Sequence, residues 1–140
     1  MPIDPVEQQA RFDQQGYSKH LGIEFDLVEE GFARLRMPVK EHHLQSVLTV
    51  HGGIVATIAD AAAAQALHTV LSDGEAFSSI ELKINYLSPA RAGDNLLAEG
   101  RIIRRGSRIA VGDMEVREEA SNRLVAKGLH TFIIQKDTSS

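Results

Sequence analysis

The residues best suited to chemistry lie in one stretch, from Val50 to Leu71. It opens with His51-Gly52-Gly53 and carries a single acidic residue, Asp60, in an otherwise apolar, alanine-rich run. Unhindered glycine amides at the start of a helix have free N–H groups that can stabilise a developing oxygen anion. A carboxylate among apolar neighbours is costly unless it is hydrogen-bonded or used. Asp60 is therefore a candidate general base or nucleophile, and Gly52 a candidate oxyanion donor.

Each of these residues also has a purely structural interpretation. The glycines could simply permit a tight entry from loop to helix. Asp60 could be a structural acid that caps a group across an interface. His51 could fix the loop through its ring or contact a substrate, and positioning is the favoured role.

The stretch predicts a long helix that is apolar on nearly every side, so other elements should surround it. It is too interrupted by polar residues to cross a membrane. Around it we expect a short N-terminal surface helix over residues 4–16, which starts at Asp4-Pro5, and two hairpin strands in 23–37. Four more strands are predicted over 79–87, 95–104, 108–118 and 123–135, with a bulge near Val111-Gly112.

These elements predict an α+β fold in which a curved antiparallel sheet wraps one long helix. A chain of 140 residues fits a single domain, 1–140, with residues 1–19 as an N-terminal helical extension and 136–140 as a flexible tail. A sheet edge and a helix surface would remain uncovered, which favours an oligomer.

Composition narrows the functional classes. The net charge of −4 gives no general reason to expect a nucleic-acid partner, and there is no cysteine for disulfide or thiolate chemistry. The N-terminus has no signal-peptide pattern, so we expect a cytoplasmic protein with no membrane association. The histidines do not share metal-ligand spacing with acids, and no metal is predicted.

The run His51-Gly52-Gly53 followed by Asp60 resembles the hotdog-fold acyl-CoA thioesterases, specifically the PaaI-like branch of the 4-hydroxybenzoyl-CoA thioesterase superfamily. The segment from Ser79 to Asp94 is similar to the strand-turn-strand signature of that family, as are Arg105-Gly106-Ser107-Arg108 and residues 124–131. The resemblance spans residues 20–134. It implies a homodimer with sites shared between chains, usually paired into a homotetramer.

The resemblance also implies roles for individual residues. Asp60 matches the catalytic carboxylate, and Gly52 matches the residue whose N–H polarises the thioester carbonyl. Gln45 sits where relatives orient substrate or water, and Ser79 where some relatives assist the water. No cofactor is expected, because coenzyme A is part of the substrate.

The remaining predicted contacts concern the substrate. Arginine forks suit phosphate oxygens, so the arginines near turns are together candidates for binding coenzyme A, although a solvated face is the favoured interpretation for any one of them. The alanine run suggests room for an aryl or medium-length acyl group. The predicted substrate-binding set is Gly53, Ala63, Arg91, Arg105 and Arg108.

The sequence thus predicts an acyl-CoA thioesterase that releases coenzyme A and a free acid. Two alternatives remain at this stage. One is a non-catalytic acyl-CoA-binding protein on the same fold. The other, the least favoured, is a dehydratase, which would call for an Asp–His pair presented from one loop, whereas His51 and Asp60 are more than two helical turns apart.

Overall fold

The computed structural model describes residues 4–136. In chain order the elements are α1 (Pro5–Asp13), α2 (Gly16–Leu21), β1 (Glu24–Glu29), β2 (Phe32–Pro38), η1 (Glu41–His43), α3 (Gly52–His68), β3 (Glu75–Tyr86), β4 (Asn95–Arg105), β5 (Ile109–Glu118) and β6 (Leu124–Lys136). Among the described residues no helix is long and apolar enough to cross a membrane. The predicted flexible tail lies outside the described residues except for Lys136, which ends β6.

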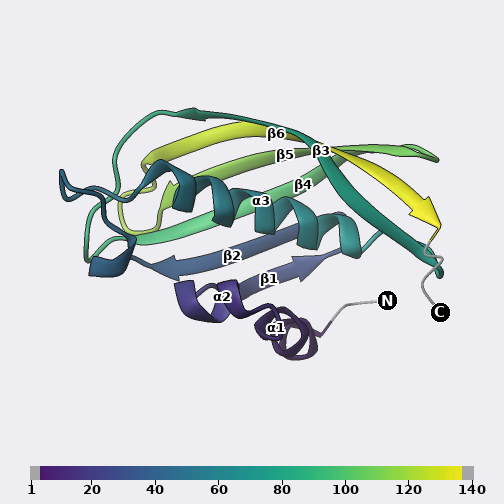
Figure 1. Ribbon diagram of the computed structural model, residues 1–140, viewed down its shortest axis with the longest axis horizontal. Helices are drawn as coiled ribbons and strands as arrows, with labels where there is room; N and C mark the ends of the chain where they lie inside the picture. The colour runs from purple at the N-terminus through teal and green to yellow at the C-terminus, as the bar shows by residue number, and fades with distance from the viewer. Residues whose placement is uncertain (1–3, 137–140) are drawn as a thin grey trace.

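The strands form one six-stranded sheet in the order β1-β2-β4-β5-β6-β3, and all neighbours are antiparallel. The sheet curves behind α3, which runs across its face (Figure 1). This arrangement confirms the predicted α+β hotdog fold. The predicted hairpin and the four later strands are all present.

Helix α3 is buried by the strands that it crosses, chiefly β2, β4 and β5. Nine of its 17 residues are buried, among them Ile58 and Leu67, which are fully inaccessible. The helix approaches β4 closely at Gly100, where an added Cβ would lie 2.5 Å from the backbone of Ala62. A strand glycine is required there because a real Cβ contact is never that short.

The N-terminal helices pack beside β1 at one edge of the sheet (Figure 1). The Asp4 side chain caps α1 by accepting from the Val6 N–H at 2.9 Å, as predicted. The expectation that α1 is only a surface helix is wrong, because Phe12 is 1% exposed and belongs to the core. The sequence did not predict α2, a six-residue helix too short to show an apolar period.

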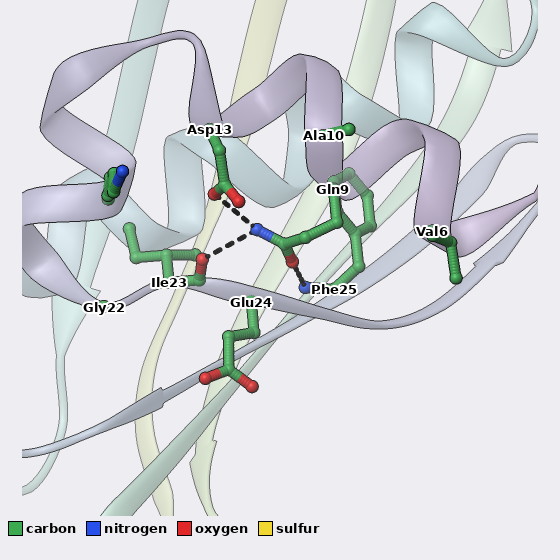
Figure 2. Close-up of a pocket in the computed structure, with 9 residues that line it drawn as sticks. Val6, Gln9, Ala10, Asp13, Gly22, Ile23, Glu24 and Phe25 are labelled. Carbon is green, nitrogen blue, oxygen red and sulfur yellow. Dashed lines mark hydrogen bonds between the residues drawn. The ribbon is translucent and has the colours of Figure 1, made fainter.

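Gln9 joins α1 to the edge strand β1 (Figure 2). Its side-chain amide accepts from the Phe25 N–H at 2.5 Å and donates to the Ile23 carbonyl at 3.3 Å. These are bonds that a neighbouring strand would otherwise make. The β1 edge is therefore covered by the chain itself.

Four strand pairs contain a register shift, and two of these shifts bear on the predicted strands and bulge. In β3 the register with β6 shifts between Ser79 and Glu81, and the strand starts at Glu75, earlier than predicted. In β4 the register with β5 shifts between Ile102 and Arg104, opposite Val111 and Gly112. The predicted bulge thus exists, but its extra residue, Ile103, lies on β4 rather than on β5.

Candidate active site

The N-terminus of α3 presents one unused hydrogen-bond donor. The His51 ring caps the helix, since its Nδ1 accepts from the Gly53 N–H at 2.9 Å. The N–H groups of Ile54 and Val55 both bond to the His51 carbonyl. Within residues 4–136 the Gly52 N–H has no acceptor. It is a free donor at the positive end of a 17-residue helix.

A cavity of about 430 Å³ adjoins this helix end. Its walls come from the loop before α3, the first turn of α3 and the segment that follows β3, and they include Gln45, Gly52, Tyr86 and Ala90. The amide of Gln45 donates to Thr49 Oγ1 at 2.9 Å, which holds the side chain in the loop. The structure therefore brings two of the predicted site residues, Gln45 and Gly52, to one cavity.

A second group of polar residues gathers midway along α3. Asp60 lies on the accessible side of the helix, Ser79 on β3 and His130 on β6. His130 Nε2 is 2.7 Å from Ser79 Oγ, and His130 Nδ1 is 3.2 Å from Asp60 Oδ1. The imidazole thus lies between a carboxylate and a hydroxyl that are 19 residues apart in the sequence.

Burial sets the charges in this group. His130 is fully buried and stacks on the Phe132 ring at 4.0 Å, and desolvation lowers its pKa to about 4. Its contact with Asp60 is therefore not an ion pair at neutral pH, and no acceptor or donor in residues 4–136 makes a well-oriented hydrogen bond to Nδ1. Burial raises the pKa of Asp60, whose side chain is still 48% exposed. This shift brings the pKa of the carboxylate closer to the operating pH, which is where a general base is most effective.

Sequence reasoning missed His130 as a site residue. The spacing of the histidines gives His130 no role as a metal ligand, but it occupies an inward position of β6, two residues from the buried Phe132. A polar side chain at a core-facing strand position is the signal that identifies it. Its partners, however, follow only from the pairing of β6 with β3, in which Leu82 lies opposite His130 and Ser79 opposite Phe132.

The two groups of site residues are separated along α3. Gly52 and Asp60 are eight residues apart, which corresponds to a rise of about 12 Å. Reacting atoms must approach to about 3–3.5 Å. A single carbonyl group therefore cannot contact Gly52 and Asp60 of the same protomer.

Ala63, predicted to contact substrate, does not lie on the accessible side of α3. It is 0% exposed and packs against the sheet near Gly112. The accessible positions of the helix around Asp60 are instead Ala56, Thr57 and Ala64. Gly53 is exposed, but its N–H is already bound by the His51 ring.

The predicted arginines do not form one cluster in the protomer. Arg91 lies in the turn before β4, beside the cavity residue Ala90. Arg105 lies at the other end of α3, where it pairs with Glu75 and donates to the Val70 carbonyl at 3.4 Å. Arg108 is exposed in the neighbouring turn, just before β5.

The cavities differ in their relation to these residues. A hollow of about 640 Å³ between α1, α2 and β1 is lined by Val6, Gln9, Asp13 and Phe25 among others, and holds none of the predicted site residues (Figure 2). Within residues 4–136, no three histidine, aspartate or glutamate side chains are grouped to hold a metal ion. The chemistry therefore centres on α3 and its two polar groups.

Residues 49–125 match the thioesterase superfamily, and the chain belongs to that family as a PaaI-like hotdog thioesterase, an enzyme that hydrolyses thioesters. It is 33% identical to the acyl-coenzyme A thioesterase PaaI of Escherichia coli over 107 residues, 76% of this chain and 74% of the relative. It is 30% identical to human acyl-coenzyme A thioesterase 13 over 95 residues, 68% of this chain and 67% of that protein.

Solved structures have the same fold. The E. coli PaaI structure superposes with a TM-score of 0.82 at 28% identity and covers 92% of each chain. A Haemophilus influenzae thioesterase superposes with a TM-score of 0.90 over 99% of this chain and 95% of its own; at 23% identity that likeness concerns the fold alone.

Proposed function

We propose that the protein is an acyl-CoA thioesterase for aryl- or medium-chain acyl groups whose active site is shared between two protomers. Asp60, Ser79 and His130 of one protomer would act on a carbonyl polarised by Gly52 of the partner subunit. The observation that carries this proposal is the Asp60–His130–Ser79 group on the accessible side of α3. A reactive carboxylate in contact with a neutral buried imidazole is a chemical arrangement rather than a packing one.

The edges of the sheet support a shared site. The β1 edge is covered by Gln9, whereas the outer edge of β3 pairs with no strand in residues 4–136. This edge strand has 12 residues and exposes apolar side chains, including Ile80 at 56% and Tyr86 at 54%. Long apolar edges are usually covered by another chain. We propose a homodimer joined through β3, and two such dimers in a homotetramer.

In the proposed reaction Asp60 removes a proton from water as the water oxygen attacks the thioester carbon. The carbonyl electrons move to the oxygen, which Gly52 N–H of the partner subunit stabilises, with Gln45 of the partner subunit nearby. When the tetrahedral intermediate collapses, the C–S bond breaks, the thiolate of coenzyme A leaves, and the proton on Asp60 passes to the thiolate. The products are a free acid and the thiol.

His130 supports both charge states of Asp60. When Asp60 is ionised, the imidazole tautomer with a proton on Nδ1 faces it. Nε2 then accepts a hydrogen bond from the Ser79 hydroxyl, and the lone pairs of the Ser79 oxygen stay free to accept from water. When Asp60 is protonated, the other tautomer leaves the Nδ1 lone pair facing the acid and donates from Nε2 to Ser79. The same pair of contacts thus suits both stages of the reaction.

Thiol release tests the proposal. Thiol release from aryl, short, medium and long acyl-CoAs is measured for three proteins: wild type, Asp60→Asn and, as a matched control, Asp73→Asn in the exposed turn before β3. We expect aryl or medium chains to react fastest, Asp60→Asn to lose at least about a hundredfold in kcat, and Asp73→Asn to equal wild type. Binding of acyl-CoA without thiol release by wild type would instead identify a non-catalytic binding protein.

A single-turnover reaction in H₂¹⁸O distinguishes the two roles of Asp60. If Asp60 is the general base, the label appears only in the released acid. If Asp60 attacks the carbonyl, water opens an anhydride and ¹⁸O can enter the carboxylate, which mass spectrometry of the peptide containing Asp60 detects.

A further inference from the structure

Tyr86, the last residue of β3, makes a close contact with the first turn of α3. Its hydroxyl donates to the Gly52 carbonyl oxygen at 2.8 Å. Its ring lies against the Gly52 Cα, since a Cβ at that position would lie 3.1 Å from Tyr86 Cζ. Both residues line the cavity of about 430 Å³ at the helix N-terminus.

The peptide unit between Gly52 and Gly53 is consequently held at both of its polar atoms. Tyr86 binds its carbonyl oxygen, and the His51 ring binds its N–H at 2.9 Å. Glycine has the widest conformational freedom of any residue, and two glycines in sequence would leave this turn loosely defined. The two side chains restrict that freedom because together they bind both polar atoms of this peptide.

The orientation of this peptide determines where the free Gly52 N–H points. That N–H belongs to the preceding peptide unit, and the φ and ψ angles of Gly52 connect the two planes. An oxyanion donor is effective when it is already aimed at the position that the anion will occupy, so that no reorganisation is needed during the reaction. Hydrogen bonds that fix the Gly52–Gly53 peptide therefore also restrict the direction of the Gly52 N–H, which belongs to the His51–Gly52 peptide.

We infer that Tyr86 is a positioning residue that aims the Gly52 N–H at the substrate carbonyl, and that position 52 excludes a side chain because the Tyr86 ring occupies that space. The inference rests on the proposed thioesterase function of this site. The fold itself does not require the Tyr86 hydroxyl. The Tyr86 side chain is 54% exposed at the end of an edge strand, so its hydroxyl contributes little to the core.

The first test is Tyr86→Phe, which keeps the ring and removes the hydroxyl. We expect kcat for the best acyl-CoA to fall roughly tenfold with KM changed less than about twofold, because the lost bond acts on the transition state. The control is Thr69→Val at the opposite end of α3, which removes two hydrogen bonds of 2.7 Å: the one that the hydroxyl donates to the Ala66 carbonyl and the one that it accepts from the Gly31 N–H. This control should retain the wild-type kcat.

The second test uses the steric contact. Gly52→Ala keeps every backbone N–H but should displace the Tyr86 ring and lower kcat. Tyr86→Val removes the ring, so adding Gly52→Ala to Tyr86→Val should cost no more than about twofold further. A loss from Gly52→Ala that is equally large with either residue at position 86 contradicts the steric part of the inference.

A third measurement does not depend on activity. Amide hydrogen exchange of Gly53 should become roughly tenfold faster in Tyr86→Phe, because the peptide loses one of its two restraints. Unchanged exchange together with unchanged kcat would overturn the inference, and so would a loss of activity that accompanies a change in oligomeric state. If wild type released no thiol, or Asp60→Asn released it normally, the proposed function would fail while the exchange result still decided the role of Tyr86.

Discussion

Acidification from pH 7 to pH 5 should weaken the fold through His130. The buried imidazole has a pKa of about 4 in the folded chain and about 6.5 in the unfolded chain. Between these values the unfolded state binds more protons, so stability is full above the unfolded pKa and falls as the pH is lowered through it. Linkage with these two pKa values gives a loss of about 2 kcal/mol between pH 7 and pH 5.

Other groups titrate in the same range and must be separated from His130. Burial raises the pKa of Asp60, which works in the opposite direction, since the folded state then binds the extra proton more readily as the pH falls. Burial also lowers the pKa values of His43 and His68, which add to the loss. A comparison of His130→Gln with its parent in an Asp60→Asn background removes the first contribution and cancels the other two.

Urea unfolding at fixed protein concentration provides the measurement. The parent should lose about 2 kcal/mol more than His130→Gln between pH 7 and pH 5, a difference of roughly 1 M in urea midpoint. If the His130→Gln protein and its parent lose stability in parallel, burial does not keep His130 neutral, and the tautomer argument for Asp60 fails with it.

Three further predictions concern other positions. The acid limb of the kcat/KM profile should lie above the ordinary Asp pKa of 3.8, since activity is lost as the pH falls through the raised pKa of Asp60. Asp60→Asn should raise the melting temperature more at pH 7 than at a pH below the ordinary Asp value, where the carboxyl is protonated, and the opposite order would be inconsistent with a desolvated carboxylate. Gly100→Ala should lower the free energy of unfolding in urea by about 3 kcal/mol or more, because its Cβ would lie 2.5 Å from the α3 backbone. A loss below about 1 kcal/mol, which is typical of a tolerated core change, would show that the helix can move away freely. Leu48→Asn should stabilise the protein by about 1 kcal/mol, because Leu48 is 69% exposed and has a φ of 65°; equal or lower stability would mean that the leucine makes a contact in the assembly.

Much of the fold could be predicted because its signals are local. The cap at Asp4, the apolar run from Gly53 and the alternation of the later strands each indicate one element without reference to the others. The same holds for the helix-terminal glycines and for Asp60, an acid that stands out against alanine. These features mark the candidate reactive segment before any contact is known.

What could not be predicted depends on pairing between distant segments. His130 meets Ser79, 51 residues away, only because β6 pairs with β3. The burial of Ala63 could not be predicted for a different reason. A helix that is apolar on all sides carries no periodic signal for the face that remains accessible. Ala63 is buried because that side of the helix packs against the sheet, most closely at Gly100. Likewise a slip in alternation locates a bulge along the chain but not the strand that carries it.

In the proposed function, the two polar groups on α3 connect catalysis with assembly. Each group is complete within one protomer: the helix N-terminus has its cap and its cavity, and Asp60 has its imidazole and hydroxyl. Their separation of about 12 Å along one helix prevents them from acting on the same carbonyl. The uncovered β3 edge provides Ser79 to one group and Tyr86 to the other, so a chain that pairs along this edge lies against both. In the proposed dimer, α3 would hold Asp60 and the Gly52 N–H at a fixed spacing, and a second copy of the same helix would supply the complementary end.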